Sequence, residues 1–531
     1  MNLLQNDWIA IRHRSGSVEK ISPLRLTADK DDSVMEIEAP RADFRGALYQ
    51  FLIGLLQTAL APHDLRTWRQ RWETPPNEQE LREAFAPYVQ AFELDSAGAA
   101  FMQDFKLPAA EPIEVAALLI DAPGEKTIAD NKDHFVHRKE VRKICFACAA
   151  TALFTLQINA PTGGAGHRVS LRGGGPLTTL LIPKGQEISL WRKLWINILP
   201  SEVLGYFETK SIADVLPWMG PTRTSDSGGV GDTTPETVHR LQTYWSMPRR
   251  LRLDFVEEVG ACDLCGETVN KLVRRYRTKN YGVNYTGVWL HPLSPYNYDP
   301  KGEKPPLSVK GQTTRGGIGY RHWLGLTLGN EEKMPDAALV VKHFMQQQER
   351  LPEAARRMQL WCFGYDMDNM KARCWYDNTL PIYSIADEKQ RELFAEAVEK
   401  LLDVATETAK ALHQYVKLAW FNRPSDHGNE PAVPQSLWQH SETEFYRTLQ
   451  ALVAADLTRN EVLIPIYCVW LRSVEHTAVE LFDEWVLTAP IEEMNMKRVI
   501  GARVGLLHQL RTKGAAKQLW IAIKEFKGVK S

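Results

Sequence analysis

The chain has 531 residues, of which 44% are hydrophobic and 24% are charged. This composition and length are typical of a globular protein with a large core and exclude collagen-like, fully disordered and disulfide-scaffold chains. The 64 lysines and arginines nearly balance the 65 aspartates and glutamates, giving a net charge of −1. Because a protein that coats nucleic acid is clearly basic, any nucleic-acid contact must come from local patches.

The N-terminal residues, MNLLQNDWIAIRHR, lack the order of basic, apolar and small residues that marks a signal peptide. The longest apolar run, residues 47–61, is too short to span a bilayer and contains Gln50 and Gln57. We therefore expect a cytoplasmic protein without membrane contact, in which this run forms a buried helix.

The first predicted elements alternate between strand and helix. Leu3–Ile11 alternates loosely and favours a strand, whereas Arg41–Leu60 and Asn77–Phe92 favour helices. Asn77 is a plausible N-cap, because Glu80 follows it at the spacing of a capping box.

The middle of the chain contains two stretches rich in glycine. The predicted apolar helix Ile144–Ile158 ends in residues 160–176, APTGGAGHRVSLRGGGP, a loop whose backbone can approach a ligand closely. Residues 217–235 are typical of a mobile loop or linker. Aromatic and β-branched residues in Tyr276–Trp289 then indicate mixed α and β structure.

From about residue 385 the pattern becomes helical. Apolar residues from Phe394 to Ala419 recur every three or four positions, which predicts a long amphipathic helix. Three further helices are predicted at 441–457, 460–486 and 492–514, the last continuing to 526. The predicted fold class is α+β, with a mixed, irregular N-terminal α/β body at 1–380 and a C-terminal four-helix bundle at 381–531.

Two CxxC pairs are the strongest chemical signal in the sequence. Cys145 and Cys148 form the first pair, and Cys262 and Cys265 form the second. Two such pairs can complete a tetrahedral structural zinc site (Zn²⁺) that leaves no open position for catalysis. A bound zinc ion would hold together two segments of the body that are far apart in the sequence. The alternatives are four buried reduced cysteines or one redox-active CxxC.

Basic residues flank both cysteine pairs. The first pair is preceded by Arg138, Lys139, Arg142 and Lys143, and the second is followed by a run of five cations between positions 271 and 279. If a metal joins the pairs, these clusters converge near the glycine loop and would suit a phosphate backbone. The alternative is two solvated charged faces.

Catalytic signatures are weak. Asp366 and Asp368 are paired carboxylates that could hold magnesium, but residues 364–371 resemble an exposed turn. The sequence contains no HExxH, GxSxG or nucleotide-binding glycine motif. A metal-dependent nuclease and a purely structural subunit are therefore alternatives to a DNA-recognition protein.

Five separated motifs follow one another along the chain: MNLLQNDWIAIR, ICFACAATALF, SLRGGGPLTTL, CDLCG and WLHPLSPY, the last at Trp289–Tyr296. Together with Phe445-Tyr446-Arg447 in the C-terminal helices, they make the whole chain similar to CasA, the large subunit of the type I-E CRISPR complex Cascade.

The resemblance implies a non-catalytic subunit that assembles with other Cascade subunits and a guide RNA. Such proteins test double-stranded DNA for a protospacer-adjacent motif, help to open the duplex and recruit the helicase-nuclease. This matches the division of labour in RNA-guided systems, in which base pairing reads the sequence and protein reads the short motif.

The resemblance also implies DNA-contacting residues. The family's glycine loop matches Thr162–Gly166, and its contacts fall on Gly163, Gly164, Ala165 and Gly166. The family also has a lysine finger, a lysine after the second CxxC pair that probes the motif. Counting without gaps places this position at Asn280, near Arg277 and Lys279, and Lys279 is the preferred candidate.

Two further family elements have candidate residues here. The first is the glutamine wedge, a side chain that inserts beneath the motif to part the DNA strands. Its position aligns with Asn369, and Met370 and Lys371 are adjacent. Because asparagine is shorter than glutamine, Met370 or Lys371 is expected to share the role of parting the strands, at an unstacking cost of a few kcal/mol. A loop before the first CxxC carries an aromatic residue, here Phe135, for docking and DNA contact; the alternative is an ordinary buried phenylalanine.

Overall fold

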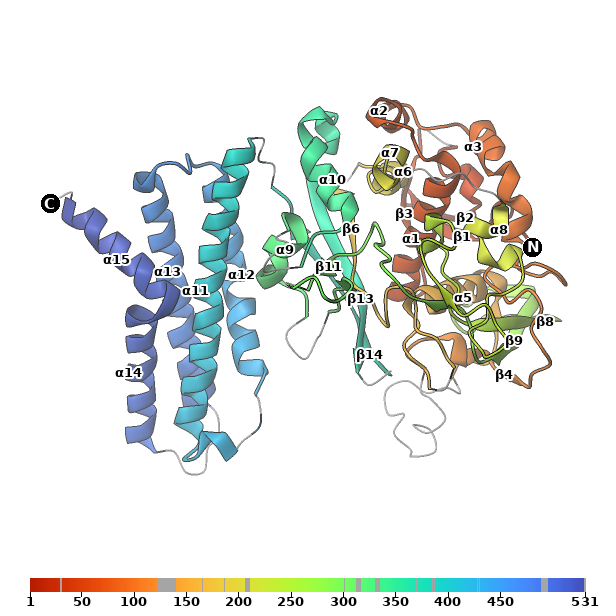
Figure 1. Ribbon diagram of the computed structural model, residues 1–531. Coiled ribbons are helices and arrows are strands. Elements are labelled where there is room, and N and C mark those ends of the chain that lie inside the picture. Colours follow the sequence, from red (N-terminus) through yellow and green to blue (C-terminus); the bar gives the residue numbers. More distant parts are fainter. Residues whose placement is uncertain are drawn as a thin grey trace. The chain divides into compact units, whose positions relative to one another are not determined.

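The computed structural model forms two compact units (Figure 1). It describes residues 1–28, 31–122, 140–164, 166–185, 187–205, 211–299, 301–311, 317–329, 335–368, 371–383, 385, 387–426, 428, 430–488 and 495–529. Unit 1 comprises Met1–Gly311 and Glu331–Thr379, and unit 2 comprises Gln312–Asn330 and Leu380–Ser531. The expected mixture of small sheets and helices, followed by a helical C-terminal region, is confirmed.

Unit 1 mixes short helices with several small sheets. Its helices are α1 (Ala42–Leu60), α2 (Leu65–Glu73), α3 (Glu78–Phe85), α5 (Phe146–Asn159), α6 (Leu190–Trp195), α7 (Ser201–Leu204), α8 (Ile212–Val215) and α10 (Leu339–Gln347). One antiparallel sheet has the order β2 (Val18–Ile21), β1 (Ile9–His13), β3 (Val34–Ile37). Two two-stranded pairs join β7 (Asp232–Thr233) to β10 (Asn284–Tyr285) and β11 (Tyr296–Asn297) to β12 (Leu307–Ser308).

Two larger sheets carry the segments of functional interest. In the first, β9 (Thr268–Lys279) pairs with β8 (Arg250–Ala261), β4 (Pro112–Glu114) and β5 (Ile144–Cys145). In the second, the order is β14 (Lys371–Pro381), β13 (Met358–Asp368), β6 (Thr178–Pro183). Arg250 faces Lys279 at one end of the β8–β9 hairpin, and the second CxxC pair follows Ala261 at the other.

The core of unit 1 contains a cluster of aromatic rings around Phe51 on α1. The rings of Phe101, Phe154 and Trp245 meet that of Phe51 edge to face, with centroids 5.7–5.9 Å apart. Trp218 is fully buried in the same cluster. The sequence-based prediction of a linker over residues 217–235 is therefore wrong at its start, because this indole anchors the segment in the core.

Several predicted boundaries differ from the structure. The strand predicted from Leu3 begins only at Ile9. The helix predicted from Asn77 has the expected capping box with Glu80, but it changes to a 3-10 helix over Ala86–Phe92, where Pro87 occupies the first turn. The helix predicted from Ile144 begins at Phe146, because Ile144 and Cys145 pair with β9.

Unit 2 consists mainly of long helices that lie side by side in Figure 1. They are α9 (Trp323–Thr327), α11 (Glu388–Trp420), α12 (Ala432–Val453), α13 (Asn460–Leu487), α14 (Met496–Thr512) and α15 (Gly514–Val529). Buried residues Leu412, Phe482 and Leu506 belong to one core cluster shared by α11, α13 and α14. The helix predicted from 441 begins earlier, at Ala432, and takes Pro434 into its first turn, where proline is tolerated.

Residues 317–329 contribute two aromatic side chains to the packing of unit 2. The Tyr320 ring stacks on Phe445 with centroids 4.3 Å apart, and its hydroxyl lies 2.7 Å from Ser441 Oγ. The Trp323 indole donates to the Pro381 carbonyl at 2.7 Å. Among the described residues of both units, no helix has the length and apolar character needed to cross a membrane.

Candidate metal centre and nucleic-acid interface

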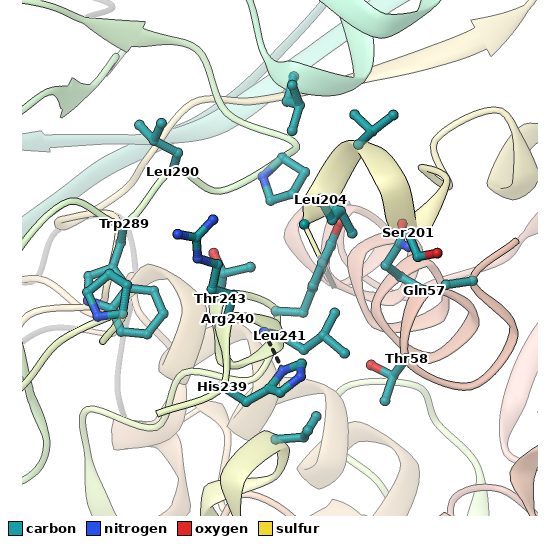
Figure 2. Close-up of a pocket in the computed structure, with 18 of the residues that line it drawn as sticks. Gln57, Thr58, Ser201, Leu204, His239, Arg240, Leu241, Thr243, Trp289 and Leu290 are labelled. Atoms are coloured by element: carbon teal, nitrogen blue, oxygen red, sulfur yellow. Dashed lines mark hydrogen bonds between the residues drawn. The ribbon is translucent and has the colours of Figure 1, made fainter. Parts of the chain in front are cut away.

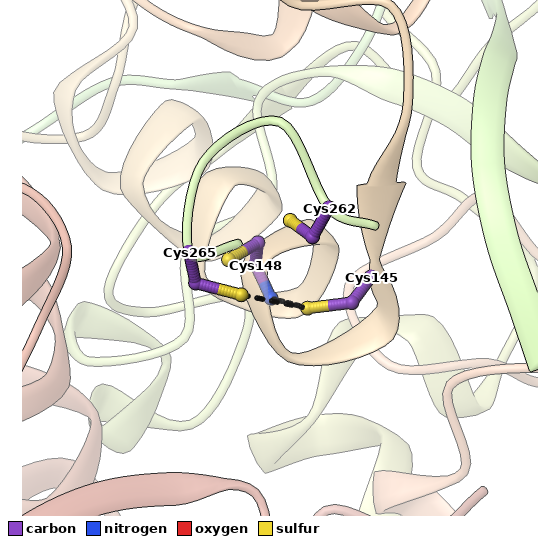
Figure 3. A group of neighbouring side chains, drawn as sticks. All are labelled: Cys145, Cys148, Cys262 and Cys265. Carbon is purple, nitrogen blue, oxygen red and sulfur yellow. Dashed lines mark hydrogen bonds between the residues drawn. The ribbon is translucent and has the colours of Figure 1, made fainter. Parts of the chain in front are cut away.

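The four cysteines of the two CxxC pairs form one cluster (Figure 3). Their sulfur atoms all lie within 4.8 Å of one another, and the Sγ atoms of Cys145 and Cys265 are 3.7 Å apart. Tetrahedral zinc with Zn–S bonds of about 2.3 Å places its sulfur ligands roughly 3.8 Å apart. The donor set and spacing therefore fit a metal ion, and the predicted joining of two remote segments is confirmed.

Local backbone structure holds each cysteine in place. Cys145 is the N-cap of α5, and its Sγ lies 3.5 Å from the Cys148 N–H. In the second pair, the Gly266 N–H donates to the Cys262 carbonyl at 2.9 Å, with Gly266 in the left-handed region at φ +75°. This turn is the tight knuckle that a chelating CxxC needs, and a glycine is required there.

The four thiols shift one another's pKa values in opposite directions. Hydrogen bonds from Cys145 and Cys148 lower the pKa of Cys265 to about 7, whereas contacts with the neighbouring thiols raise the pKa of Cys148. Cys145, Cys148 and Cys262 are buried, and Cys265 is exposed. A bound metal ion would stabilise all four groups as thiolates.

Asp263 ties the second knuckle to the segment that precedes the first. Its carboxylate accepts from the backbone N–H groups of Arg142 and Lys143 at 2.7 and 2.9 Å. The Asp263 N–H donates back to the Lys143 carbonyl at 3.0 Å. Arg142 and Lys143, which precede the first CxxC pair, therefore lie next to the second pair, as expected from the sequence. Arg138 and Lys139 lie outside the described residues.

Much of the predicted basic patch is neutralised, however. Across the hairpin, Lys271 pairs with Glu257 at 2.8 Å, Arg274 with Glu258 at 2.6 Å, and Arg277 with Asp254 at 3.3 Å. Three of the five cations in the run from 271 to 279 are therefore paired with acidic side chains of β8, and a positive patch that binds a phosphate backbone stays a prediction. Within the described part of the chain, Lys279 has no such ion pair.

The run also extends away from the metal cluster. The twelve-residue strands of the hairpin span on the order of 35 Å. The cysteines lie at one end, and Lys279 and Asn280 lie at the other. This far end meets the glycine loop.

The glycine loop contacts the far end of the hairpin directly. The Tyr281 N–H donates to the Gly166 carbonyl at 2.7 Å. A Cβ built on Gly166, where φ is +78°, would lie 2.8 Å from the Cβ of Asn280. Two segments that the family resemblance assigned to DNA reading are therefore adjacent.

The individual glycines of this loop have different surroundings. A Cβ on Gly163 would lie 2.9 Å from Nη1 of Arg249, whereas no described atom lies within 4 Å of a Cβ on Gly164. Gly164 has φ +84° and is exposed. The loop thus packs against the body through Gly163 and Gly166 and presents Gly164 outward.

The positions that the family resemblance assigns to the wedge fall between β13 and β14 in the sequence. β13 ends at Asp368 and β14 begins at Lys371, which is exposed. Of the sequence-predicted DNA-contacting residues, four lie outside the described residues: Phe135, Ala165, Asn369 and Met370.

The candidate nuclease carboxylates face an arginine. Arg373 of β14 lies 2.8 Å from Asp366 and 3.5 Å from Asp368, and Asp366 is fully buried. The prediction of an exposed turn from residue 364 is wrong, because Gly364–Asp368 belong to β13. With a guanidinium already between these carboxylates, the pair is poorly suited to hold Mg²⁺.

A cavity of about 510 Å³ lies elsewhere in unit 1 (Figure 2). No sequence pattern indicated it, because its mostly apolar lining comes from distant segments. Two of its polar groups have structural bonds: His239 accepts from the Leu241 N–H at 3.1 Å, and Thr58 donates to the Gly54 carbonyl at 2.7 Å. The buried hydroxyls of Thr243 and Tyr244, which also line the cavity, have no hydrogen-bond partner among the described atoms. Among its described lining residues, no nucleophile is paired with a base.

Comparison with known proteins gives a consistent result. A family model described as CRISPR-associated protein Cse1 matches residues 2–481. CasA from Thermus thermophilus is 20% identical with a TM-score of 0.67, over 96% of this chain and 99% of that chain. Cse1 from Thermobifida fusca is 16% identical with a TM-score of 0.69, over 98% of each chain.

A third solved structure, named "CRISPR RNA-guided surveillance complex", contains a chain that is 15% identical with a TM-score of 0.63, over 96% of this chain and 99% of that chain. At such identities these likenesses show the shared fold. Because the family model covers nearly the whole sequence, the chain belongs to the family of CRISPR-associated protein Cse1.

Proposed function

We propose that this chain is the non-catalytic large subunit of a cytoplasmic, RNA-guided CRISPR surveillance complex. In this role it reads the protospacer-adjacent motif of double-stranded DNA, helps to open the duplex and recruits the helicase-nuclease. Its partners are the other complex subunits, the guide RNA and the DNA target. The cysteine cluster holds Zn²⁺ as a structural ion.

One observation carries the DNA-reading role. The glycine loop and the end of β9 come from segments over a hundred residues apart, yet the Gly166 carbonyl and the Tyr281 N–H are joined at 2.7 Å. An exposed backbone turn beside Lys279 and Asn280 suits a DNA groove, because glycine allows close approach and the lysine attracts phosphates.

A second contact supports a shared reading surface. Gly175, at the end of the same loop, has φ +59°, and a Cβ there would lie 2.7 Å from Cγ of Met367 on β13. β13 leads directly to the wedge positions. The loop is therefore packed against both of the other elements that the family resemblance implicates.

The role is tested by gel shift of the assembled complex on targets that differ only in the adjacent motif. Lys279→Met is expected to reduce discrimination between the motifs. Lys271→Met is the matched control, because Lys271 lies on the same strand but is held by Asp95 and Glu257 at 2.6 and 2.8 Å. Equal discrimination by the wild type and Lys279→Met would reject this assignment.

The non-catalytic role has its own test. Purified protein is incubated with DNA and Mg²⁺ or Mn²⁺, and we expect no cleavage. Cleavage that Asp368→Ala abolishes would instead favour the nuclease alternative.

A further inference from the structure

Arg249 lies beneath the glycine loop without a carboxylate partner in the described part of the chain. Its Nη2 donates to the Pro161 carbonyl, and its Nε is buried with no hydrogen-bond partner among the described atoms. Both terminal nitrogens crowd the inner face of Gly163, at 2.9 and 3.2 Å from a Cβ built there. Gly163 is thus the residue that lets this guanidinium approach the loop backbone.

The position of Arg249 is firmly fixed. The Gln157 side chain accepts from the Arg249 N–H at 2.9 Å and donates to the Arg249 carbonyl at 3.0 Å. Burial lowers the pKa of Arg249 to about 10, so the folded protein holds a charge that it disfavours. Burial, and then the Arg249 charge, also lower the pKa of the neighbouring His167.

A largely buried cation without a counter-ion is costly, and its cost is recovered when an anion binds beside it. We infer that Arg249 supplies the charge for a DNA backbone phosphate that binds beside it, against the exposed backbone of Gly163 and Gly164. The inference rests on the proposed DNA-reading function and assigns a phosphate diester, rather than a base edge, to this part of the surface.

The loop geometry favours a phosphate as the ligand. Gly164 is exposed and has open space around it, so an anion can approach the backbone there. Backbone amides and arginine are the usual partners of phosphate oxygens, and such contacts position DNA without reading its sequence. Arg249 therefore acts at the edge of the loop as a positioning charge, complementary to Lys279 and Asn280.

The test is the salt dependence of target binding by the assembled complex. Each neutralised phosphate contributes about 0.9 to the slope of log affinity against log salt. Between 50 and 200 mM salt, the wild type should therefore lose about threefold more affinity than Arg249→Met. This difference should be the same for every adjacent motif, because a phosphate contact carries no sequence information.

Arg252→Met is the matched control, because Arg252 is a nearby arginine on β8 whose guanidinium donates to the carbonyls of Ser96 and Gly98. Its salt slope should equal that of the wild type. If Arg249→Met does not fold, Gly163→Ala serves instead, since its Cβ displaces the guanidinium while the charge remains; it should flatten the slope as well.

A scan with single methylphosphonates, which are uncharged, locates the phosphate. At one position, a methylphosphonate should lower the affinity of the wild type but not that of Arg249→Met. The modified phosphate and the Arg249 substitution remove the same interaction, so their effects do not add. If the salt slope of Arg249→Met equals that of the wild type while the complex still discriminates motifs, the role of Arg249 is overturned but the proposed function is not. A wild-type complex that does not discriminate motifs would instead overturn the proposed function.

Discussion

Gln157 brackets the backbone of Arg249, accepting from its N–H at 2.9 Å and donating to its carbonyl at 3.0 Å. Gln157 lies in the last turn of α5, and Cys145 caps the first turn of the same helix. Arg249 immediately precedes β8, whose other end leads to Cys262. Helix and hairpin are therefore fastened to each other at both ends, by the thiol cluster at one end and by Gln157 at the other.

This double attachment predicts the effect of metal removal. We expect about one zinc ion per chain by elemental analysis, and a loss of several kcal/mol in the free energy of unfolding of unit 1 for Cys262→Ser, because metal binding energy is folding energy. Cys374→Ser, which changes an exposed cysteine outside the cluster, is the control and should leave both quantities unchanged. A metal-free wild type that unfolds as stably as the metal-loaded protein would contradict this prediction.

The sequence predicted the parts of the fold that depend on local periodicity or ligand spacing. The apolar repeat from Phe394 to Ala419 defined α11 well, because a long amphipathic helix is set by its own residues. The CxxC spacing predicted the thiol cluster, because metal chemistry restricts which residues can serve as ligands.

Features that depend on tertiary partners could not be predicted. Trp218 lies in a glycine-rich, linker-like stretch, yet its indole is buried and donates to the Ala91 carbonyl at 2.5 Å. The ion pairs of the β9 cations could not be foreseen, because Glu257 and Glu258 reach Lys271 and Arg274 from a part of β8 whose pairing with β9 is irregular. The role of Arg249 could not be predicted from the sequence, since only the folded loop shows that this side chain lacks a counter-ion among the described residues.

Gly164 and Gly166, two left-handed glycines of the loop, should respond differently to the same substitution. Gly164→Ala and Gly166→Ala each place a side chain at positive φ, which costs roughly 1–2 kcal/mol. Only at Gly166 does the new Cβ also meet Asn280, at 2.8 Å. We therefore expect a greater loss of thermal stability in Gly166→Ala than in Gly164→Ala, and a loss of motif discrimination mainly in Gly166→Ala, measured by gel shift of the assembled complex. Equal discrimination in the two variants would show that contact with Asn280 does not matter for DNA reading.

His291 should make the stability of unit 1 depend on pH. Burial, and then the charge of Arg172, lower the pKa of His291 well below its ordinary value, and its Nδ1 accepts from the Leu293 N–H at 3.1 Å. The unfolded chain therefore binds a proton below about pH 6.5 that the folded chain does not bind. The free energy of unfolding should fall as the pH decreases below that value, by at most about 1.4 kcal/mol per pH unit from this residue.

Urea unfolding at pH 7.5, 6.0 and 5.0 measures this dependence. His291→Asn retains a hydrogen-bond acceptor but cannot be protonated, so its stability should change less with pH than that of the wild type. Parallel pH profiles for the two proteins would show that His291 does not bind its proton differently in the folded and unfolded states.

In unit 2, a single carboxylate caps the last helix. Glu407 of α11 accepts from the Ala515 N–H at 2.7 Å, at the start of α15, where unpaired N–H groups and the helix dipole favour negative charge. Glu407→Ala should lower the free energy of unfolding of unit 2 by about 1–2 kcal/mol. Glu407→Gln keeps an acceptor without the charge and should lose less.

Gly514 supplies the matched partner for this test. It has φ +62°, and a Cβ there would collide with the Glu407 carboxylate. Gly514→Ala should therefore disturb the same cap, so the double variant Glu407→Ala/Gly514→Ala should lose less stability than the sum of the two single losses. Urea unfolding of the four proteins gives the coupling directly. Strict additivity would mean that Glu407 does not cap α15 in solution, because independent sites contribute independently to the free energy of unfolding.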